Sequence, residues 1–247
     1  MEISSVVNPK IVEFSKLSEA KYRNKTGLFS VEGQKVLEDI LDNDIKIENV
    51  FSTLEKIPGL PENIDVIKVS QPVIKKLCSS SSAPKIVTIA HKREFSPSEI
   101  KKYKKVLLLD SINDPGNLGT LIRSLVAFGF EALVLYGNCV DEYNPKVLRS
   151  CTGNFFKIPI FKISRLEKAV FGDFTFLTTD LHMPANDPAA VDLPEKFVLA
   201  LGSEARGLNV DFSKFETKNV LLKTEKVESL NLSVSGSILM YELSKKF

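Results

Sequence analysis

The sequence has no tryptophan, only two histidines and three cysteines, and its apolar runs are short. Cys78, Cys139 and Cys151 cannot pair completely and form no Cys-x-x-Cys motif, which argues against a disulfide framework and a zinc site. No run approaches the roughly 18 apolar residues of a membrane span, and the first ten residues lack the apolar segment of a signal peptide. These absences predict a cytoplasmic protein with no metal and no membrane partner.

The scarcity of histidine also restricts the chemistry that the chain can use. A two-histidine metal site would need both His91 and His182, and nothing in the local sequence supports one. A Ser-His-Asp triad would need one of them, and no Gly-x-Ser-x-Gly motif is present. Function is therefore expected to rest on arginine, glutamate, asparagine and serine side chains and on backbone groups.

Charge is distributed unevenly along the 247 residues, whose formal net charge is +2. Residues 1–105 carry 18 Lys and Arg against 14 Asp and Glu, whereas residues 106–247 carry 15 against 17. A basic first half suits a nucleic-acid backbone as partner, although lysine-rich surfaces are often only solvated faces.

Short α/β elements are predicted in the first ninety residues. We predict a domain over residues 1–95, a linker over 96–105, where Pro97 precedes a run of lysines, and a second domain over 106–247. The first domain is expected to contain helices at 8–22, 33–41 and 70–78 and strands at 28–31, 50–51, 66–69 and 86–90.

The second domain alternates apolar strands with helices, a pattern typical of a parallel sheet that is covered on both faces. The fold class is therefore α/β. Strands are expected at 106–109, 132–135, 158–160, 174–177, 197–201 and 220–222, and helices at 117–128, 145–149, 164–170 and 229–243.

The first motif, Asp-Pro-Gly-Asn-Leu-Gly-Thr-Leu-Ile-Arg at residues 114–123, follows a predicted strand. It lacks the lysine of a phosphate loop and the glycine spacing of a dinucleotide site, and a Gly-x-x-Gly clamp at Gly116–Gly119 is weak evidence for RNA. Helical spacing puts Asn117 and Arg123 together on the polar side of the helix. Alternatively, Asn117 is an N-cap and Arg123 is a solvated arginine.

The second motif, Leu-Gly-Ser-Glu-Ala-Arg-Gly at residues 201–207, ends a strand, where open α/β sheets bind their ligands. Gly202 lets a backbone approach a ligand closely, although a plain turn with an exposed Glu204 is the simpler interpretation. The third motif, Glu-Ser-Leu-Asn-Leu-Ser-Val at 228–234, opens the last helix. Ser229 is expected to be its N-cap, and the small residues at 233–237 favour close packing.

Taken together, Asn-x-Gly-x-x-x-Arg, Leu-Gly-Ser-Glu-x-x-Gly and Glu-Ser-Leu-Asn-x-Ser-Val resemble the three motifs of the SpoU (TrmH-type) branch of the SPOUT RNA methyltransferases. Residues 21–33, Lys-Tyr-Arg-Asn-Lys-Thr-Gly-Leu-Phe-Ser-Val-Glu-Gly, are similar to the opening of that family's ribosomal-protein-like substrate-binding domain. The resemblance implies a deep C-terminal trefoil knot that binds S-adenosylmethionine, a homodimer with the site at its interface, and methylation of a ribose 2′-hydroxyl in RNA.

The resemblance also implies roles for particular residues. One segment departs from it: Leu-Leu-Lys-Thr-Glu stands at 221–225, where the family usually has Ile-Pro-Met-x-Gly. The implied catalytic residues are Asn117, Arg123, Glu204, Ser229 and Asn231. The implied cofactor contacts are Leu201, Gly202, Leu221, Leu230 and Thr179.

Lys21, Arg23 and Lys25 are expected to contact RNA phosphates. Ribosomal RNA is the first choice of substrate, because the two-domain layout resembles ribosomal RNA enzymes. A tRNA 2′-O-methyltransferase, and a non-catalytic RNA-binding or ribosome-assembly factor on the same fold, stay open as alternatives. So does the role of Arg123: the family proposal makes it the proton acceptor, but a guanidinium stays protonated and is better suited to clamp a phosphate.

Overall fold

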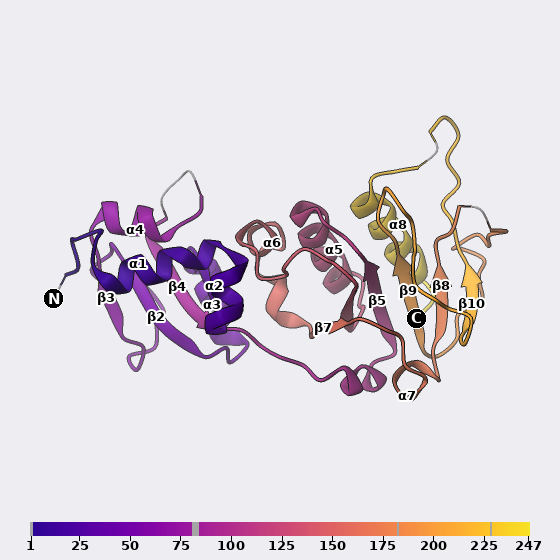
Figure 1. Ribbon diagram of the computed structural model, residues 1–247, viewed down its shortest axis with the longest axis horizontal. Helices are drawn as coiled ribbons and strands as arrows, with labels where there is room; N and C mark the ends of the chain where they lie inside the picture. The colour runs from indigo at the N-terminus through magenta and orange to yellow at the C-terminus, as the bar shows by residue number, and fades with distance from the viewer. Residues whose placement is uncertain (1, 81–83, 182, 228) are drawn as a thin grey trace. The chain divides into compact units, whose positions relative to one another are not determined.

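The computed structural model describes residues 2–80, 84–181, 183–227 and 229–247, and it divides into two compact units (Figure 1). Unit 1 contains Met1–Arg93 and Asp141–Phe156, and unit 2 contains Glu94–Val140 and Lys157–Phe247. This division differs from the predicted one in two respects. Asp141–Phe156, expected in the second domain, belongs to unit 1, and unit 2 begins at Glu94, so it includes the residues 96–105 that were predicted as a linker. Among the described residues, no helix has both the length and the apolar character needed to cross a membrane.

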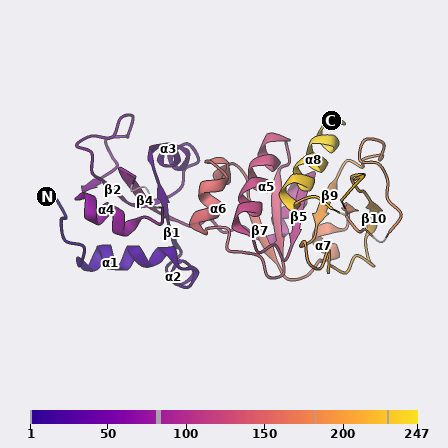
Figure 2. The same ribbon diagram turned by 90° about the horizontal axis from the view of Figure 1, so that it is seen from above.

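Unit 1 is a four-stranded sheet with helices on both faces (Figure 2). One face packs on α1 and α4, through residues such as Phe14, Ile74 and Ile89, and the other packs on α3 through Leu37 and Val50. The strands, in spatial order, are β1 (Leu28–Glu32), β4 (Ile86–His91), β2 (Ile47–Ser52) and β3 (Val66–Lys68). The helices just named are α1 (Pro9–Ser15), α4 (Gln71–Leu77) and α3 (Gln34–Asp42).

The N-terminal helix predicted over residues 8–22 is interrupted. It consists of α1, a 3₁₀ turn η1 (Lys16–Ser18) and α2 (Ala20–Thr26), because Glu19 has an extended backbone. The predicted Asn8 cap is confirmed: its side chain accepts a hydrogen bond from the Lys10 amide at 3.0 Å. Gly27, with φ of 68°, ends α2 in the left-handed conformation that glycine adopts without strain.

Arg23 stabilises this interruption from inside unit 1. Its guanidinium donates to the carbonyls of Leu17 and Ser18, both at 2.8 Å, and its Nε donates to Asp141 at 2.7 Å. Only 1% of its surface is exposed. The prediction that Arg23 contacts RNA phosphates is therefore wrong, since its donors are used within the protein.

Aromatic packing explains why Asp141–Phe156 joins unit 1. The ring of Tyr143 lies 4.7 Å from that of Phe29 in β1 and 5.0 Å from that of Phe155, and Phe156 lies 5.9 Å from Phe29. Burial raises the pKa of Tyr143 to about 12, so the phenol stays neutral. The segment also includes α6 (Pro145–Ser150) and the 3₁₀ helix η3 (Asn154–Lys157), whose last residue belongs to unit 2.

Unit 2 is a six-stranded sheet in which every pair of neighbours is parallel, as the sequence predicts. The expected strand at 220–222 is wrong: β10 pairs with β8 at 216–219, and it is an edge strand of mostly polar residues, so no apolar run marks it. In spatial order the strands are β10 (Glu216–Asn219), β8 (Thr175–Thr178), β9 (Phe197–Leu201), β5 (Lys105–Asp110), β6 (Ala132–Tyr136) and β7 (Ile160–Ile163).

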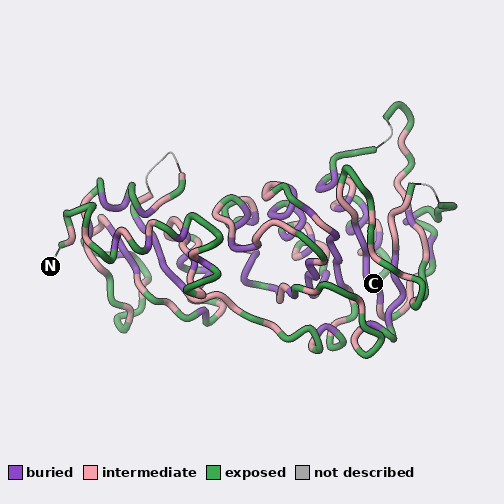
Figure 3. Tube along the Cα trace, viewed as in Figure 1, coloured by how far each residue is buried: buried purple, intermediate pink, exposed green. Residues whose placement is uncertain are grey.

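Alternation along the central strands supplies both faces of this sheet. Val106, Leu108 and Val198 point to a core that also includes residues of η2 (Pro97–Lys102) and α7 (Lys168–Phe171). The opposite face is covered by α5 (Pro115–Ala127) and α8 (Leu232–Ser244) (Figure 2). Buried residues follow the strands and the inner sides of these helices in Figure 3. The parallel α/β class is confirmed, whereas the trefoil knot stays a prediction.

Residues 96–105, predicted as a linker, are folded onto unit 2. Ser96 and Glu99 form a capping box at the start of η2, and Ile100 is completely buried. The run of lysines that suggested a linker lies on the outer side of this turn, where charge is solvated. The physical reason for the difference is that one apolar residue per turn is enough to fix a short 3₁₀ helix on a core.

Close packing of α8 was predicted from its small residues and is confirmed. A Cβ on Gly236 would lie 2.6 Å from methyl carbons of both Leu121 in α5 and Leu201 in β9. The hydroxyls of Ser124 and Ser237 are 2.7 Å apart between the same two helices. Glycine and serine thus bring the α8 backbone close to α5, and this contact positions the start of α8 beside the start of α5.

Candidate active site

The three sequence motifs meet in unit 2 through a chain of side-chain hydrogen bonds. Asn117 Nδ2 donates to Glu204 Oε1 at 2.7 Å, and Asn231 Nδ2 donates to Asn117 Oδ1 at 3.2 Å. One residue of each motif is involved, although the motifs are about 25 to 115 residues apart in the sequence. The fold therefore brings the three motifs, which are far apart in the sequence, together in one site.

Asn117 is at the centre of this chain and is almost buried, at 9% exposure. It lies in the first turn of α5, whose N-cap is Asp114: the Asp114 carboxylate accepts from the Asn117 amide at 2.8 Å. The predicted polar, exposed side of α5 is thus wrong for Asn117, and so is the alternative that it is the N-cap. Because its amide donates to a carboxylate and accepts from another amide, its orientation is fixed by both neighbours.

Asn231 has two tasks at the start of α8. Its Oδ1 accepts from the Ser233 amide at 3.0 Å and from the Ser233 hydroxyl at 2.7 Å, so Asn231 is the N-cap, while its Nδ2 reaches Asn117. Ser229, predicted as the cap, lies two residues earlier with its side chain exposed. Glu228 of the same motif lies outside the described residues. An asparagine suits this position because it can cap and donate at once.

Glu204 lies in a tight turn after β9. Ser203 and Gly207 exchange two backbone hydrogen bonds of 3.1 and 2.8 Å, and Gly207 has φ of 64°. A Cβ on Gly202 would lie 2.0 Å from the Gly207 carbonyl carbon. The glycine is therefore required by the turn's own backbone, a reason that differs from the close approach of a ligand proposed from the sequence.

Asp110 was missed by the sequence analysis, although it supports the same turn. It ends β5 and is 1% exposed, and its Oδ2 accepts from the Asn209 amide at 2.6 Å while its Oδ1 accepts from the Ser111 hydroxyl at 2.8 Å. The signal that could have indicated it was an acidic residue directly after the apolar run Val106–Leu109. Its carboxylate joins the first motif's strand to the segment after the second motif.

Four of the expected cofactor residues, Thr179, Gly202, Leu221 and Leu230, lie on loops that follow neighbouring strands, and Leu201 is the buried last residue of β9. Thr179, after β8, donates its hydroxyl to the Ala200 carbonyl of β9 at 3.1 Å, which places it next to Leu201. The Leu221 amide, after β10, donates to the Asn186 carbonyl at 3.4 Å. Leu230, just before α8, is 37% exposed.

Asn219, the last residue of β10, was also missed. Its side-chain amide donates to the Asp180 and Met183 carbonyls at 2.8 and 3.1 Å, and its Oδ1 accepts from the Asp180 amide at 2.8 Å and from the Thr178 hydroxyl at 3.2 Å. One polar residue in an edge strand gives no sequence signal. It holds the loop after β8 against the loop after β10.

Arg123 lies on the exposed side of α5, in the turn after Asn117. No ion pair with Arg123 occurs within the part of the chain that the structure describes. An exposed guanidinium is suited to bind an anionic group such as a phosphate.

The cysteines do not compete for a catalytic role. Burial raises the pKa of the Cys78 and Cys139 thiols, and it raises that of Cys151 to about 12, so these thiols are protonated at neutral pH. Within the described ranges, no cluster of three or more histidine, cysteine or acidic residues forms a potential metal site.

A parallel α/β domain with asparagine, glutamate and asparagine linked across three motifs defines a methyltransferase domain of the SpoU type. The family model described as "SpoU rRNA Methylase family" matches residues 104–241, which is more than half of the chain. A second model, "MRM3-like substrate binding domain", matches residues 8–88. The chain therefore belongs to the SpoU rRNA methylase family.

Individual relatives agree with this assignment over nearly the full length. The chain is 30% identical to the 23S rRNA (guanosine(2553)-2′-O)-methyltransferase RlmP of Bacillus subtilis, with 98% of each chain covered. It is similar to an AdoMet-bound rRNA methyltransferase from Sinorhizobium meliloti, with a TM-score of 0.87, 25% identity and coverage of 100% and 98%. An RNA 2′-O ribose methyltransferase structure gives a TM-score of 0.75, 27% identity and coverage of 100% and 99%.

These findings confirm the expected fold class, the expected class of enzyme and S-adenosylmethionine as the expected methyl donor at the level of the family.

Proposed function

We propose that this chain transfers the methyl group of S-adenosylmethionine to a ribose 2′-hydroxyl of ribosomal RNA. The observation that carries the proposal is the Glu204–Asn117–Asn231 chain of hydrogen bonds, which unites the three family motifs in one site. Support for ribosomal RNA comes from the relative in Bacillus subtilis, which is named for a 2′-O-methylation of 23S rRNA. A cytoplasmic location belongs to the same proposal.

The residues present fit an adenosyl methyl donor. The loops after β8, β9 and β10 follow neighbouring strands, and such loops bind ligands in open parallel sheets. Their side chains include exposed apolar groups, Leu181 and Leu230, which suit the adenosine rings, while Thr179 and Leu221 fix the loop backbones. We propose that these loops belong to a C-terminal trefoil knot. When bound, S-adenosylmethionine supplies an electrophilic methyl group.

The protein's contribution is positioning and electrostatics. We assign to Arg123 the binding of a phosphate beside the target ribose, a contact that would hold the 2′-oxygen in line with the methyl group. A guanidinium close to the hydroxyl also stabilises the developing negative oxygen. Glu204, Asn117 and Asn231 keep the three loops in register, and Ser229 offers an exposed hydroxyl at the mouth of the third loop.

We assign RNA affinity to the first domain. The proposed domain boundaries are residues 1–95 for this domain, 96–105 for the linking segment and 106–247 for the methyltransferase domain. Lys21 and Lys25 are exposed on α2, and neither has an ion-pair partner among the residues that the structure describes. Both therefore remain proposed phosphate contacts, whereas Arg23 does not.

The function is tested by incubating the purified chain with labelled S-adenosylmethionine and ribosomal RNA from cells that lack the gene. Label is expected in 23S rRNA at one ribose, detected by nuclease-resistant dinucleotides. Label in tRNA would favour the tRNA alternative. Binding of S-adenosylmethionine or RNA without transfer to either would favour a non-catalytic assembly factor and contradict the proposal.

A homodimer is part of the proposed function, and a surface of α8 supports it. Val234, Ile238 and Tyr241 recur at helical spacing on one side of α8 and are 47%, 37% and 47% exposed. The Tyr241 ring lies 5.6 Å from that of Phe128, just after α5, and extends the apolar surface. An exposed apolar stripe of this kind is typical of a subunit interface, and a second copy of the chain is its proposed occupant.

Replacing Ile238 by glutamate is expected to abolish the dimer, because it places a charge in the centre of this stripe. Light scattering should change from about twice the 27.5 kDa chain mass to a single chain. Thr217→Glu, on the exposed part of β10, adds the same charge elsewhere and should leave the mass unchanged. A wild-type chain that is monomeric at micromolar concentration would refute the dimer.

A further inference from the structure

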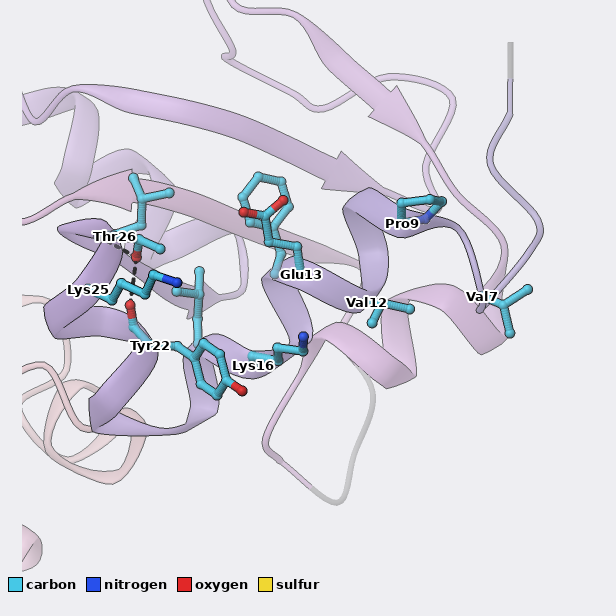
Figure 4. Close-up of a pocket in the computed structure, with 11 residues that line it drawn as sticks. Val7, Pro9, Val12, Glu13, Lys16, Tyr22, Lys25 and Thr26 are labelled. Carbon is cyan, nitrogen blue, oxygen red and sulfur yellow. Dashed lines mark hydrogen bonds between the residues drawn. The ribbon is translucent and has the colours of Figure 1, made fainter.

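Unit 1 contains a pocket between α1 and α2 that lies outside the three motifs. Its volume is about 490 Å³, within the range of small-ligand sites. Figure 4 shows that its walls come from α1, the 3₁₀ turn and α2. The interruption of the N-terminal helix, which the buried Arg23 stabilises, separates these walls.

The floor of this pocket is apolar and includes an aromatic ring. Phe14 and Leu17 are buried at its base, and the half-buried Tyr22 forms one wall. The Lys16 ammonium lies 5.4 Å from the centre of the Tyr22 ring, and Figure 4 shows the two side chains next to each other. Within the described part of the chain, no protein group hydrogen-bonds to the Tyr22 hydroxyl.

The rim of the pocket is charged. Lys16 and Lys25 are exposed and make no ion pair with any described residue, and Glu13 contributes one carboxylate. An aromatic wall with cations beside it is what single-stranded nucleic acid uses, since bases stack on rings while phosphates bind cations. A carboxylate on the same rim can accept from an exocyclic base amine.

We propose that this pocket binds one unpaired nucleotide of the RNA substrate. Its base stacks on Tyr22 in the place that the Lys16 ammonium occupies, and its phosphates are bound by Lys16 and Lys25. An apolar peptide is disfavoured, because two unpaired lysines at the rim would have no counter-charge. This inference rests on the proposed function, and it adds a contact to a nucleotide outside the catalytic unit.

The absence of tryptophan from the chain permits a direct test. Tyr22→Trp places a single fluorophore in the pocket, and the full chain is titrated with a 12-nucleotide mixed-sequence single-stranded RNA. We expect its fluorescence to be quenched at the concentrations at which anisotropy of labelled RNA reports binding. An abasic ribose-phosphate oligomer of equal length should bind without this quenching. Equal responses to both oligomers would overturn base stacking in the pocket.

Kinetics separate this inference from the proposed function. Tyr22→Leu keeps an apolar side chain against the core but removes the ring, and it is expected to raise KM for RNA about tenfold with kcat unchanged. Lys35→Ala removes one lysine from α3, which contributes no residue to the pocket, and should leave KM within about twofold. Thermal melting of each variant checks that unit 1 is folded.

The outcomes are distinct. Methylation by the wild type with an unchanged KM in Tyr22→Leu would refute the pocket and leave the proposed function intact. If RNA quenches the fluorescence of the Tyr22→Trp variant but the wild-type chain methylates no RNA, the proposed activity is refuted and the pocket is kept. If Tyr22→Leu does not fold, Lys25→Ala replaces it, with an expected increase in KM of about threefold.

Discussion

Replacing Arg123 by alanine is expected to lower the single-turnover rate of methyl transfer by about 10²- to 10³-fold, the usual effect of removing one charged donor that stabilises a developing oxyanion. Arg123 is exposed on α5 and is not required for any contact with the core, so the variant should melt at the temperature of the wild type. The measurement is a quench-flow assay with enzyme in excess over RNA.

Arg123→Lys distinguishes the two roles that the sequence leaves open. Lysine keeps the charge but cannot form a two-pronged contact with a phosphate, so a bidentate clamp predicts a loss of at least about tenfold. Proton acceptance predicts instead a rate that increases with pH in the lysine variant, because lysine deprotonates more readily than arginine. A near-normal, pH-independent rate in Arg123→Lys would remove the clamp.

Replacing Arg23 by alanine is expected to destabilise unit 1 by about 3–5 kcal/mol, the range found when one partner of a buried ion pair is removed. Arg23 is 1% exposed and holds Asp141 together with two carbonyls at the interruption of the N-terminal helix. Urea unfolding followed by circular dichroism measures the effect. Activity should decrease only where unit 1 unfolds, since Arg23 does not contact RNA.

Lys21→Ala is the matched control, because it removes an exposed cation from the same short helix. It should change unfolding by less than about 0.5 kcal/mol and weaken RNA binding at low salt. The double variant Arg23→Ala/Asp141→Ala should be less destabilised than the sum of its single variants, since neither charge is then left unpaired. If the Arg23→Ala protein has normal stability but has lost its affinity for RNA, the prediction that Arg23 contacts RNA phosphates would be restored.

The sequence was sufficient to predict the structure wherever a local pattern of residues favoured a single type of element or contact. Uniformly apolar runs such as Val106–Leu109 are short, which favours strands buried on both faces over helices, and their alternation with helices favours parallel neighbours. The small residues around Gly236 similarly indicated a close helix contact. In these cases the local preference and the final fold agree.

The sequence failed where a residue's environment is made by distant segments. Arg23 and Lys21 are both basic and lie on one short helix, but only Arg23 faces Asp141. The edge strand β10 has no apolar run. Asn219 within it forms side-chain hydrogen bonds with Thr178, Asp180 and Met183, which no spacing predicts.

By itself the sequence determined the four inner strands of the parallel sheet, the three motifs and the family to which their spacing belongs, because these depend on side-chain type and short-range periodicity. Only the tertiary structure decided that Asn117 is buried between Glu204 and Asn231, that Asn231 rather than Ser229 caps α8, and that Arg23 is structural. Asn117 and Arg23 are paired with polar groups of distant segments, and Asn231 adds to its local cap a contact with Asn117. Burial selects such distant partners only after the chain has folded.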